Sequence, residues 1–297
     1  EWTMTAVLRY RSYAKINLYL DVINRRRDGY HNIETIFQTV TLADELTFEE
    51  RAQRVSMTCS SPELDTGEGN LVYRAAMLLR RRTGCRLGAR IHLEKRIPIA
   101  AGLAGGSGNA AAALVALNVL WDLRLSPARL RAFALELGSD VPYCLQGGTA
   151  AATGRGQELV ALRPLSGEMW FVLAHPEIAV SASHTYNHPL LGHSAERPFA
   201  GRTASFRRAI RMVESGDFPC MVFNRMETPV FHEHPHLAAM KARLMELGCV
   251  AAAMSGSGPT LFGVCADRRA AARIAEMLPD MRTSVVAPAP HGVERIQ

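Results

Sequence analysis

The N-terminal part of the chain alternates between apolar and polar positions with the period of a β-strand. Over residues 8–23 one side of the pattern collects alanine, isoleucine and leucine, and the other carries Lys15 and Asn17. Since side chains on a strand point to opposite faces in turn, Lys15 and Asn17 are expected to face the same way. A turn at Asp28-Gly29 follows, and then a second β-rich stretch that includes Phe37.

Helices and strands alternate through the rest of this half. Asn70 is a helix N-cap and Gly84 a left-handed terminator, which predicts a helix over residues 71–83. Ser126-Pro127 begins another helix, which Gly138 ends. The other elements expected here are a strand over 89–97, a helix from near Asn109 to about Trp121, and strands over 148–163.

A second region begins near residue 166. Its expected elements are a strand over 169–174, helices over 203–215 and 235–247, a strand–loop–strand over 250–264, a helix over 268–277 and a closing strand over 284–287. The pattern predicts an α+β protein with mixed or antiparallel sheets and two domains, residues 1–165 and 166–297.

Composition and charge narrow the class of protein. With 297 residues, 48% apolar and 21% charged, the chain has an ordinary globular composition. Its longest uncharged run, residues 97–121, is interrupted by glycines and polar residues, so it does not predict a membrane-spanning helix. The six cysteines are far apart, which favours reduced thiols in a cytoplasmic protein over disulfides or zinc. The net charge of +6 favours acidic partners, either nucleic acid or polyphosphate metabolites.

The strongest chemical signal is a glycine-rich loop over residues 98–111, PIAAGLAGGSGNAA, between a strand and a helix. Successive glycines let backbone N–H groups converge on an anion, and a helix N-terminus adds partial positive charge. Four glycines in seven residues exceed what a packed turn needs, so we predict a phosphate site. Its glycines are Gly102, Gly105, Gly106 and Gly108, with the hydroxyl of Ser107 among them.

Two further segments carry candidate chemistry. In GSDVP, Asp140 follows a helix end, and Pro142 is expected to keep Val141 extended, so that a stiff turn holds a carboxylate able to accept a hydroxyl proton. On its own Asp140 would be an ordinary turn residue. Glycines also interrupt a strand pair at residues 254–260, MSGSGPT. The HEHPH segment, residues 232–236, resembles a metal-ligand set, but its proline breaks the helical register and we expect no metal site there.

The chain resembles the GHMP kinases, whose three motifs have counterparts here in the same order: PIAAGLAGGSGNAA, GSDVP and SGSGPT. The segment AKINLYLDVINRRRDGYHNIETIFQTV is similar to the opening of those members that act on 4-diphosphocytidyl-2-C-methyl-D-erythritol (CDP-methylerythritol). The likeness runs from about residue 11 to 265. It implies an N-terminal domain like domain 2 of ribosomal protein S5 and a ferredoxin-like C-terminal α/β sandwich. It also implies transfer of the ATP γ-phosphoryl group to the substrate 2-hydroxyl, a step of non-mevalonate isoprenoid biosynthesis.

The resemblance implies roles for individual residues. Asp140 would be the catalytic base and Lys15 its electrostatic partner. Those near ATP would be Asn70, Leu71, Pro98, Gly102, Leu103, Ala104, Gly105, Gly106, Ser107, Gly108 and Asn109. Those near the substrate would be Asn17, Tyr30, His31, Phe37, Tyr186, Ser255, Gly256, Ser257 and Gly258. The expected cofactors are ATP and Mg²⁺ carried with it, and the expected state is a monomer or weak homodimer without nucleic acid or membrane partners.

Two positions depart from the family pattern. The family usually reads GLGGGS, whereas this chain has Ala104 at the first of the three consecutive glycines. Alanine strains the loop if that position needs positive φ. The residue after Ser107, usually serine or alanine, is Gly108 here. Two alternatives stay open from the sequence. One is a GHMP kinase for another alcohol, such as mevalonate or homoserine. The other is a basic RNA-binding or ligand-sensing module that has lost activity.

Overall fold

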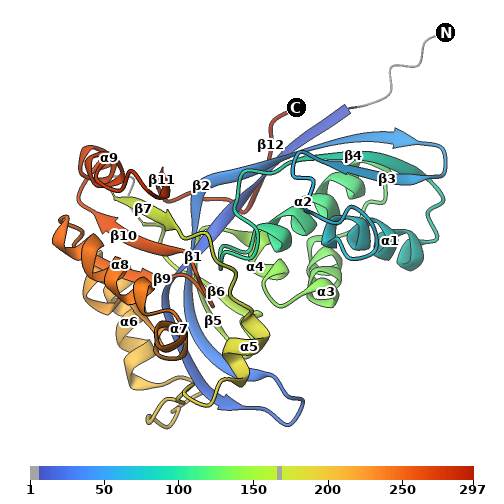
Figure 1. Ribbon diagram of the computed structural model, residues 1–297. Helices are drawn as coiled ribbons and strands as arrows, with labels where there is room; N and C mark the ends of the chain where they lie inside the picture. The colour runs from blue at the N-terminus through green and yellow to red at the C-terminus, as the bar shows by residue number, and fades with distance from the viewer. Residues whose placement is uncertain (1–6, 166–168) are drawn as a thin grey trace.

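The computed structural model describes residues 7–165 and 169–297, which build two β-sheets and two groups of helices (Figure 1). The first sheet has eight strands and the second has four. The central element is a long antiparallel hairpin of β1 (Val7–Arg25) and β2 (His31–Arg51), which runs the length of the molecule. The α+β class predicted from the sequence is confirmed.

The other strands of the first sheet add to both sides of this hairpin. Antiparallel to β2 lie β4 (Gly88–Glu94) and β5 (Thr149–Thr153), which in turn carry β3 (Val55–Cys59) and β6 (Glu158–Ala161). Two short strands from the second half of the chain join β1, namely β8 (Phe223–Asn224) and, close to the C-terminus, β12 (Val293–Arg295). The C-terminus therefore lies beside the start of β1.

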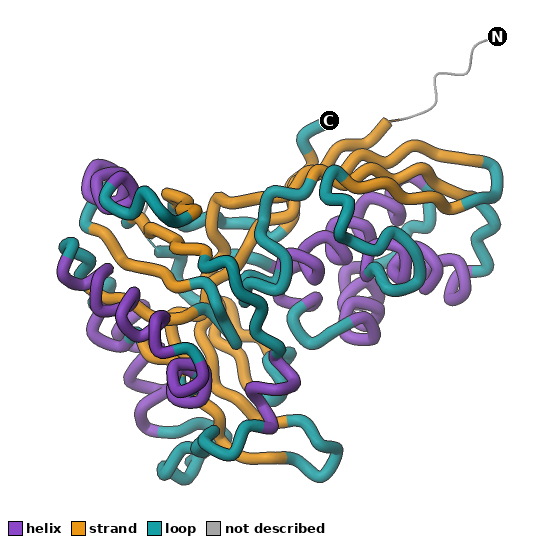
Figure 2. The backbone as a smooth tube through the Cα atoms, in the orientation of Figure 1, coloured by secondary structure: helices purple, strands orange, loops and turns teal. Residues whose placement is uncertain are grey.

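Helices α1 (Leu71–Thr83), α2 (Gly105–Leu120), α3 (Pro127–Leu137) and α4 (Val141–Gln146) gather on one side of this sheet (Figure 2). Four consecutive alanines of α2, residues 110–113, are fully buried. Because alanine is small, α2 packs closely between β1 and α1, and its N-terminus is fixed against β1. None of the helices in the described part of the chain is long and apolar enough to cross a membrane.

The second sheet has the strand order β11 (Arg282–Val286), β7 (Trp170–His175), β10 (Leu261–Cys265), β9 (Ala251–Met254). Its surroundings include α5 (Ala182–Asn187), α6 (Ala204–Ser215), a 3₁₀ turn (Phe218–Met221), α7 (Glu227–Glu233), α8 (Pro235–Glu246) and α9 (Arg268–Glu276). Phe171 and Phe262 meet edge to face in its core, with ring centroids 6.2 Å apart. The helix α5 lies beside the lower half of the β1–β2 hairpin (Figure 1), and its His184 contacts Glu233 of α7 at 2.8 Å.

Several local predictions are confirmed. Asn70 caps α1 through its side chain and Gly84 ends it at φ 73°, and Ser126 caps α3. Lys15 and Asn17 share a face, since the Nζ of Lys15 donates to Oδ1 of Asn17 at 2.7 Å.

Other local predictions were wrong. The helix expected from Asn109 begins at Gly105, so the glycines form its first turn. Val141 is not extended but begins α4, since a proline in the first helical turn costs no hydrogen bond. The strand near residue 284, β11, is not the last strand of the chain as predicted, because β12 follows it. The expected boundary between residues 165 and 166 falls at a segment outside the described residues. The two-domain division stays a prediction.

A buried charge cluster joins the first sheet to the start of α2. The carboxylate of Asp44 on β2 is fully buried and accepts from Nζ of Lys95 at 2.7 Å and from Nδ2 of Asn109 at 2.8 Å. It also accepts from the backbone N–H groups of Arg96 and Ile97, at 2.7 and 2.8 Å. With four donors the carboxylate is fully compensated, so the cluster fixes where the chain leaves β4 and enters the glycine loop.

Replacing Asp44 by asparagine should strongly destabilise the protein, because it leaves the Lys95 ammonium buried without its counter-charge. Breaking such a buried pair costs about 3–5 kcal/mol of the free energy of unfolding. Asp122→Asn is the matched control, since Asp122 pairs with Arg124 at 2.8 Å on the surface, where solvent screens the pair and its loss should change stability little. Urea unfolding of both variants measures the difference, and equal, small losses would contradict the assigned role of Asp44.

Candidate active site

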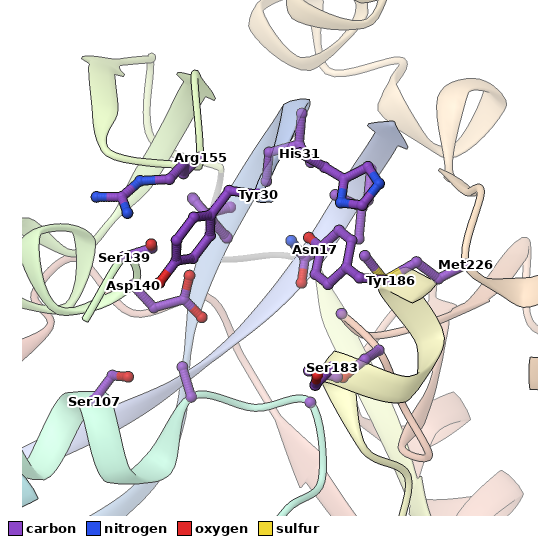
Figure 3. Close-up of a pocket in the computed structure, with 18 of the residues that line it drawn as sticks. Asn17, Tyr30, His31, Ser107, Ser139, Asp140, Arg155, Ser183, Tyr186 and Met226 are labelled. Atoms are coloured by element: carbon purple, nitrogen blue, oxygen red, sulfur yellow. The ribbon is translucent and has the colours of Figure 1, made fainter. Parts of the chain in front are cut away.

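A cavity of about 700 Å³ lies between the β1–β2 hairpin, the N-terminus of α2, the α3–α4 junction and α5. Tyr30 and Asp140 line one side of it, Tyr186 and Met226 the other, and Asn17 lies between them (Figure 3). A second cavity, of about 340 Å³, follows the glycine loop toward α1. Gly102, Ala104 and Ser107 line both cavities, so the loop forms their common wall.

Lys15 is a cation buried at the base of the larger cavity. Its Nζ donates to Oδ1 of Asn17 at 2.7 Å and to the carbonyl oxygen of Gly102 at 2.8 Å, and Asn17 in turn donates to Oγ1 of Thr35. Burial lowers the pKa of Lys15, and the nearby negative charge of Asp140 opposes that shift. An ammonium with two fixed acceptors and a neighbouring carboxylate is therefore held in one position without a direct ion pair.

Asp140 lies at the turn between α3 and α4. It has helical dihedral angles, φ −84° and ψ −17°, and its side chain does not cap α4. The carboxylate instead lines the larger cavity, together with Ser139 and Lys15. The position of Asp140 is thus fixed by the start of α4, and not by an extended Val141 before Pro142 as expected. A carboxylate so placed can accept a proton from a ligand hydroxyl.

The glycine loop runs directly into α2. Ala104 occupies the residue before the helix with φ 55°, so the position that departs from the family pattern does require a left-handed conformation. The positive φ on which the expected strain depended is therefore present. The following residues form the first turn of α2, whose N–H groups have no intrahelical acceptors and carry the positive end of the helix dipole. They line the smaller cavity, which suits an anion.

Gly102 ties the loop to the glycine cluster of the second sheet. Its carbonyl oxygen accepts from Nζ of Lys15 and, at 3.0 Å, from Oγ of Ser255. Asn224 holds the same cluster by donating to the carbonyl oxygens of Met254 and Gly256, at 2.7 and 2.8 Å. At Gly102, φ is 74° and an added Cβ would lie 2.0 Å from the carbonyl oxygen of Ser255. Only glycine fits this approach.

Aromatic side chains gather at the far end of the larger cavity. The imidazole of His31 stacks on Tyr186, with ring centroids 5.1 Å apart and planes at 20°. Tyr30 is exposed and carries the guanidinium of Arg155 over its ring at 4.6 Å. Burial lowers the pKa of His31, with the charge of Arg25 acting in the same direction, so the neutral ring with one donor and one acceptor is favoured.

The structure brings most of the sequence-predicted residues together. All of the residues predicted near ATP line the smaller cavity except Gly108, which packs against the backbone of Tyr13. Those predicted near the substrate line the larger cavity except Ser255, which donates to the carbonyl oxygen of Gly102, and Gly258, which donates to that of Ser255. Phe37 is buried below Lys15, whose Nζ lies 5.7 Å from its ring centroid.

The sequence reasoning missed several residues that line these cavities. Arg155 and Met226 belong to the larger cavity, and Lys95 and Asp65 to the smaller one. Arg155 had a signal in the sequence, since a basic residue between two glycines, in TGRG, is expected to lie in a tight turn. Gly154 and Gly156 on either side of it have φ 67° and 101°.

Comparisons with known proteins agree with this geometry. A family model for the GHMP kinases N terminal domain matches residues 70–148, and one for the GHMP kinases C terminal matches residues 202–281. A 4-diphosphocytidyl-2-C-methyl-D-erythritol kinase from Pelotomaculum thermopropionicum is 44% identical over 88% of this chain and 90% of its own. A crystal structure of 4-(cytidine 5'-diphospho)-2C-methyl-D-erythritol kinase matches 95% of this chain and 99% of its own, with TM-score 0.76 and 34% identity.

The chain therefore belongs to the GHMP kinase family, a class of small-molecule kinases that use ATP. Within that class, its sequence is similar over most of its length to the 4-diphosphocytidyl-2-C-methyl-D-erythritol kinases, as the N-terminal segment indicated. A homoserine kinase structure from Cytophaga hutchinsonii, with TM-score 0.77 over 100% of this chain and 99% of its own, is only 18% identical, so it shares the fold alone.

Replacing Gly102 by alanine should displace the loop, because the new Cβ would collide with the carbonyl oxygen of Ser255. We expect a loss of about 2 kcal/mol or more in the free energy of unfolding, of which the left-handed conformation alone accounts for about 1–2 kcal/mol. Gly106→Ala is the matched control. Its Cβ would meet only Cδ1 of Leu71 at 3.8 Å, and alanine favours a helix over glycine by up to about 1 kcal/mol. Thermal or urea unfolding compares the two, and a Gly102 variant as stable as the Gly106 variant would disprove the constraint.

Proposed function

We propose that this chain transfers the γ-phosphoryl group of ATP to the 2-hydroxyl of 4-diphosphocytidyl-2-C-methyl-D-erythritol, a step in isoprenoid precursor biosynthesis. The observation that carries this proposal is the shared wall between two cavities. One is suited to a nucleoside triphosphate along the glycine loop, and the other contains Lys15, Asp140 and the aromatic end. A hydroxyl in the larger cavity and a phosphate in the smaller one would meet at that wall.

In the proposed reaction the substrate 2-hydroxyl oxygen forms a bond to the γ-phosphorus while the bond to the β–γ bridging oxygen breaks, releasing ADP. The hydroxyl proton passes to the carboxylate of Asp140. The ammonium of Lys15 stabilises the negative charge that develops on the attacking oxygen and the transferred group. Little covalent chemistry falls to the protein in such a transfer, so positioning and charge compensation account for most of the rate.

The phosphates of ATP would lie on the N–H groups at the start of α2, between residues 102 and 109. Among the described residues that line the two cavities, the carboxylates are Asp28, Asp65 and Asp140, and no three-ligand cluster is found there. This donor set fits a magnesium ion that arrives on the ATP phosphates and keeps several waters. When bound, the ion neutralises phosphate charge. Asp140 remains free to take the proton.

The cytidine would bind at the aromatic end. A neutral His31 can offer a donor and an acceptor to the edge of the base, and Tyr30 and Tyr186 provide faces for stacking. Arg155, placed over Tyr30, carries positive charge to the rim where the diphosphate of this substrate would pass. An alcohol without a base, such as homoserine or mevalonate, would leave these groups without a partner. This is why we favour the nucleotide substrate over the alternative that shares only the fold.

Several further assignments form part of the same proposal. Residues 1–165 and 166–297 would be the two domains of the kinase, with the active site between them. The protein would act in the cytoplasm as a monomer or weak homodimer. We favour an active kinase over a sensor or RNA-binding module because both Lys15 and Asp140 are retained in the cavity.

Asp140→Asn should lower kcat by about 10²–10⁴-fold, since the amide keeps the size of the carboxylate but cannot accept the proton. A coupled assay of ADP release with ATP, Mg²⁺ and CDP-methylerythritol measures this. The exposed variant Asp122→Asn is the control for folding and assay conditions and should keep the parental rate. A folded Asp140→Asn protein with near-parental kcat would exclude Asp140 as the base.

CDP alone should compete with CDP-methylerythritol but not with ATP, because it fills the aromatic end without reaching Asp140. The measurement is ADP release at increasing CDP, with each substrate varied in turn. Homoserine and mevalonate are the comparison substrates, and both should be turned over far more slowly. If CDP does not compete, and either homoserine or mevalonate is turned over efficiently, the substrate is a small alcohol without a base.

A further inference from the structure

Three potential metal ligands meet where α5 approaches the end of α7. One of them, Glu233, belongs to the HEHPH segment, in which we expected no metal site from the sequence, and the other two come from the α5 region. His184 and His188 lie four residues apart at the end of α5, and Glu233 is the last residue of α7. The Nε2 atoms of the two histidines lie 2.8 Å and 3.2 Å from the same oxygen, Oε1 of Glu233. Ligand atoms of all three residues lie within 4.8 Å of one another.

We propose that His184, His188 and Glu233 form a binding site for zinc or a similar divalent transition metal. Two imidazoles and one carboxylate are a ligand set that zinc accepts, with a fourth position left for water. His188 is the C-cap residue directly after α5, and its ring lies beside that of His184, with centroids 5.8 Å apart. The donors come from segments 45 residues or more apart in sequence, so a metal would join α5 to α7.

The present geometry is close to what a metal requires. Tetrahedral bonds of about 2.0–2.2 Å place neighbouring ligand atoms about 3.3 Å apart. The two nitrogen–oxygen distances of 2.8 and 3.2 Å therefore need only small outward shifts. Two of the side chains can make these shifts freely, because His184 is 60% and Glu233 34% exposed, whereas His188, 9% exposed, is already fixed.

One contact opposes the metal. The backbone N–H of Leu190 donates to Nδ1 of His188 at 3.1 Å, which favours the tautomer with its proton on Nε2. Metal binding through Nε2 moves that proton to Nδ1 and breaks this hydrogen bond. The loss is small, because Leu190 is 44% exposed and its N–H can turn to water. Three coordinate bonds outweigh one hydrogen bond of this kind.

The site has a consequence for the larger cavity, and this consequence rests on the proposed function. The side of α5 away from the histidine pair carries Ser183 and Tyr186, which line that cavity, and Tyr186 stacks on His31. A metal that pins α5 to α7 would hold the wall against which we place the cytosine. Zinc would then slow amide hydrogen exchange across residues 182–188.

The test is zinc binding by the full-length protein without nucleotides, so that its result does not depend on the kinase reaction. Protein treated with a chelator and desalted is titrated with ZnCl₂ against a chromophoric zinc indicator. The wild type should bind one equivalent. His184→Gln and Glu233→Gln should each weaken binding by more than about 100-fold, since even the partners of metal ligands affect affinity by about 10–100-fold.

His92→Gln is the matched control. His92 also lies beside a carboxylate, with its Nε2 3.8 Å from Oε2 of Glu94, but it belongs to no three-ligand cluster among the described residues. This variant should bind zinc like the wild type. The proposal is overturned if the wild type binds no stoichiometric zinc, or if the His184 and Glu233 variants bind it as tightly as His92→Gln. His184 and Glu233 are exposed enough that the substitutions should not disturb folding, which circular dichroism can verify.

Discussion

The site depends on one buried cation, the Nζ of Lys15. Its hydrogen bonds to Asn17 and to the carbonyl oxygen of Gly102 connect β1 to the glycine loop, and the bond from Ser255 to the same carbonyl adds the second sheet. Burying an ammonium is costly unless its N–H groups find hydrogen-bond acceptors, so Lys15 stays charged only while Asn17 and Gly102 keep these positions. Stability and chemistry thus impose the same arrangement on three distant segments.

A second buried charge supports the loop from below. Asp44 binds Lys95, Asn109 and two backbone N–H groups, which fixes both ends of the segment between β4 and α2. Between two fixed ends the loop can keep strained residues, such as Ala104 in its left-handed conformation. The exposed arginine–carboxylate pairs of the first sheet are of another kind, because solvent screens them and they fix no element.

The aromatic end of the larger cavity is held by ring contacts rather than by buried charges. His31 and Tyr186 stack on each other, and Tyr30 is exposed beneath Arg155. A base that enters must therefore extend or separate an existing stack. Tyr186 belongs to the short helix α5, which lies beside the lower half of the β1–β2 hairpin (Figure 1). One half of the site thus holds the groups that we assign to phosphate and proton, and the other half holds the groups that we assign to recognition.

The sequence by itself determined the elements whose signals are local. Alternation placed Lys15 and Asn17 on one face, Asn70 and Gly84 marked the ends of α1, and the glycine motif indicated the loop that lines the smaller cavity. Only the tertiary structure decided where α2 begins, that Val141 is helical, that β12 returns to β1, and that Glu233 meets His184 and His188. The reason is physical. Capping and periodicity act within a few residues, whereas these features depend on packing between segments whose separation in the sequence carries no local signal.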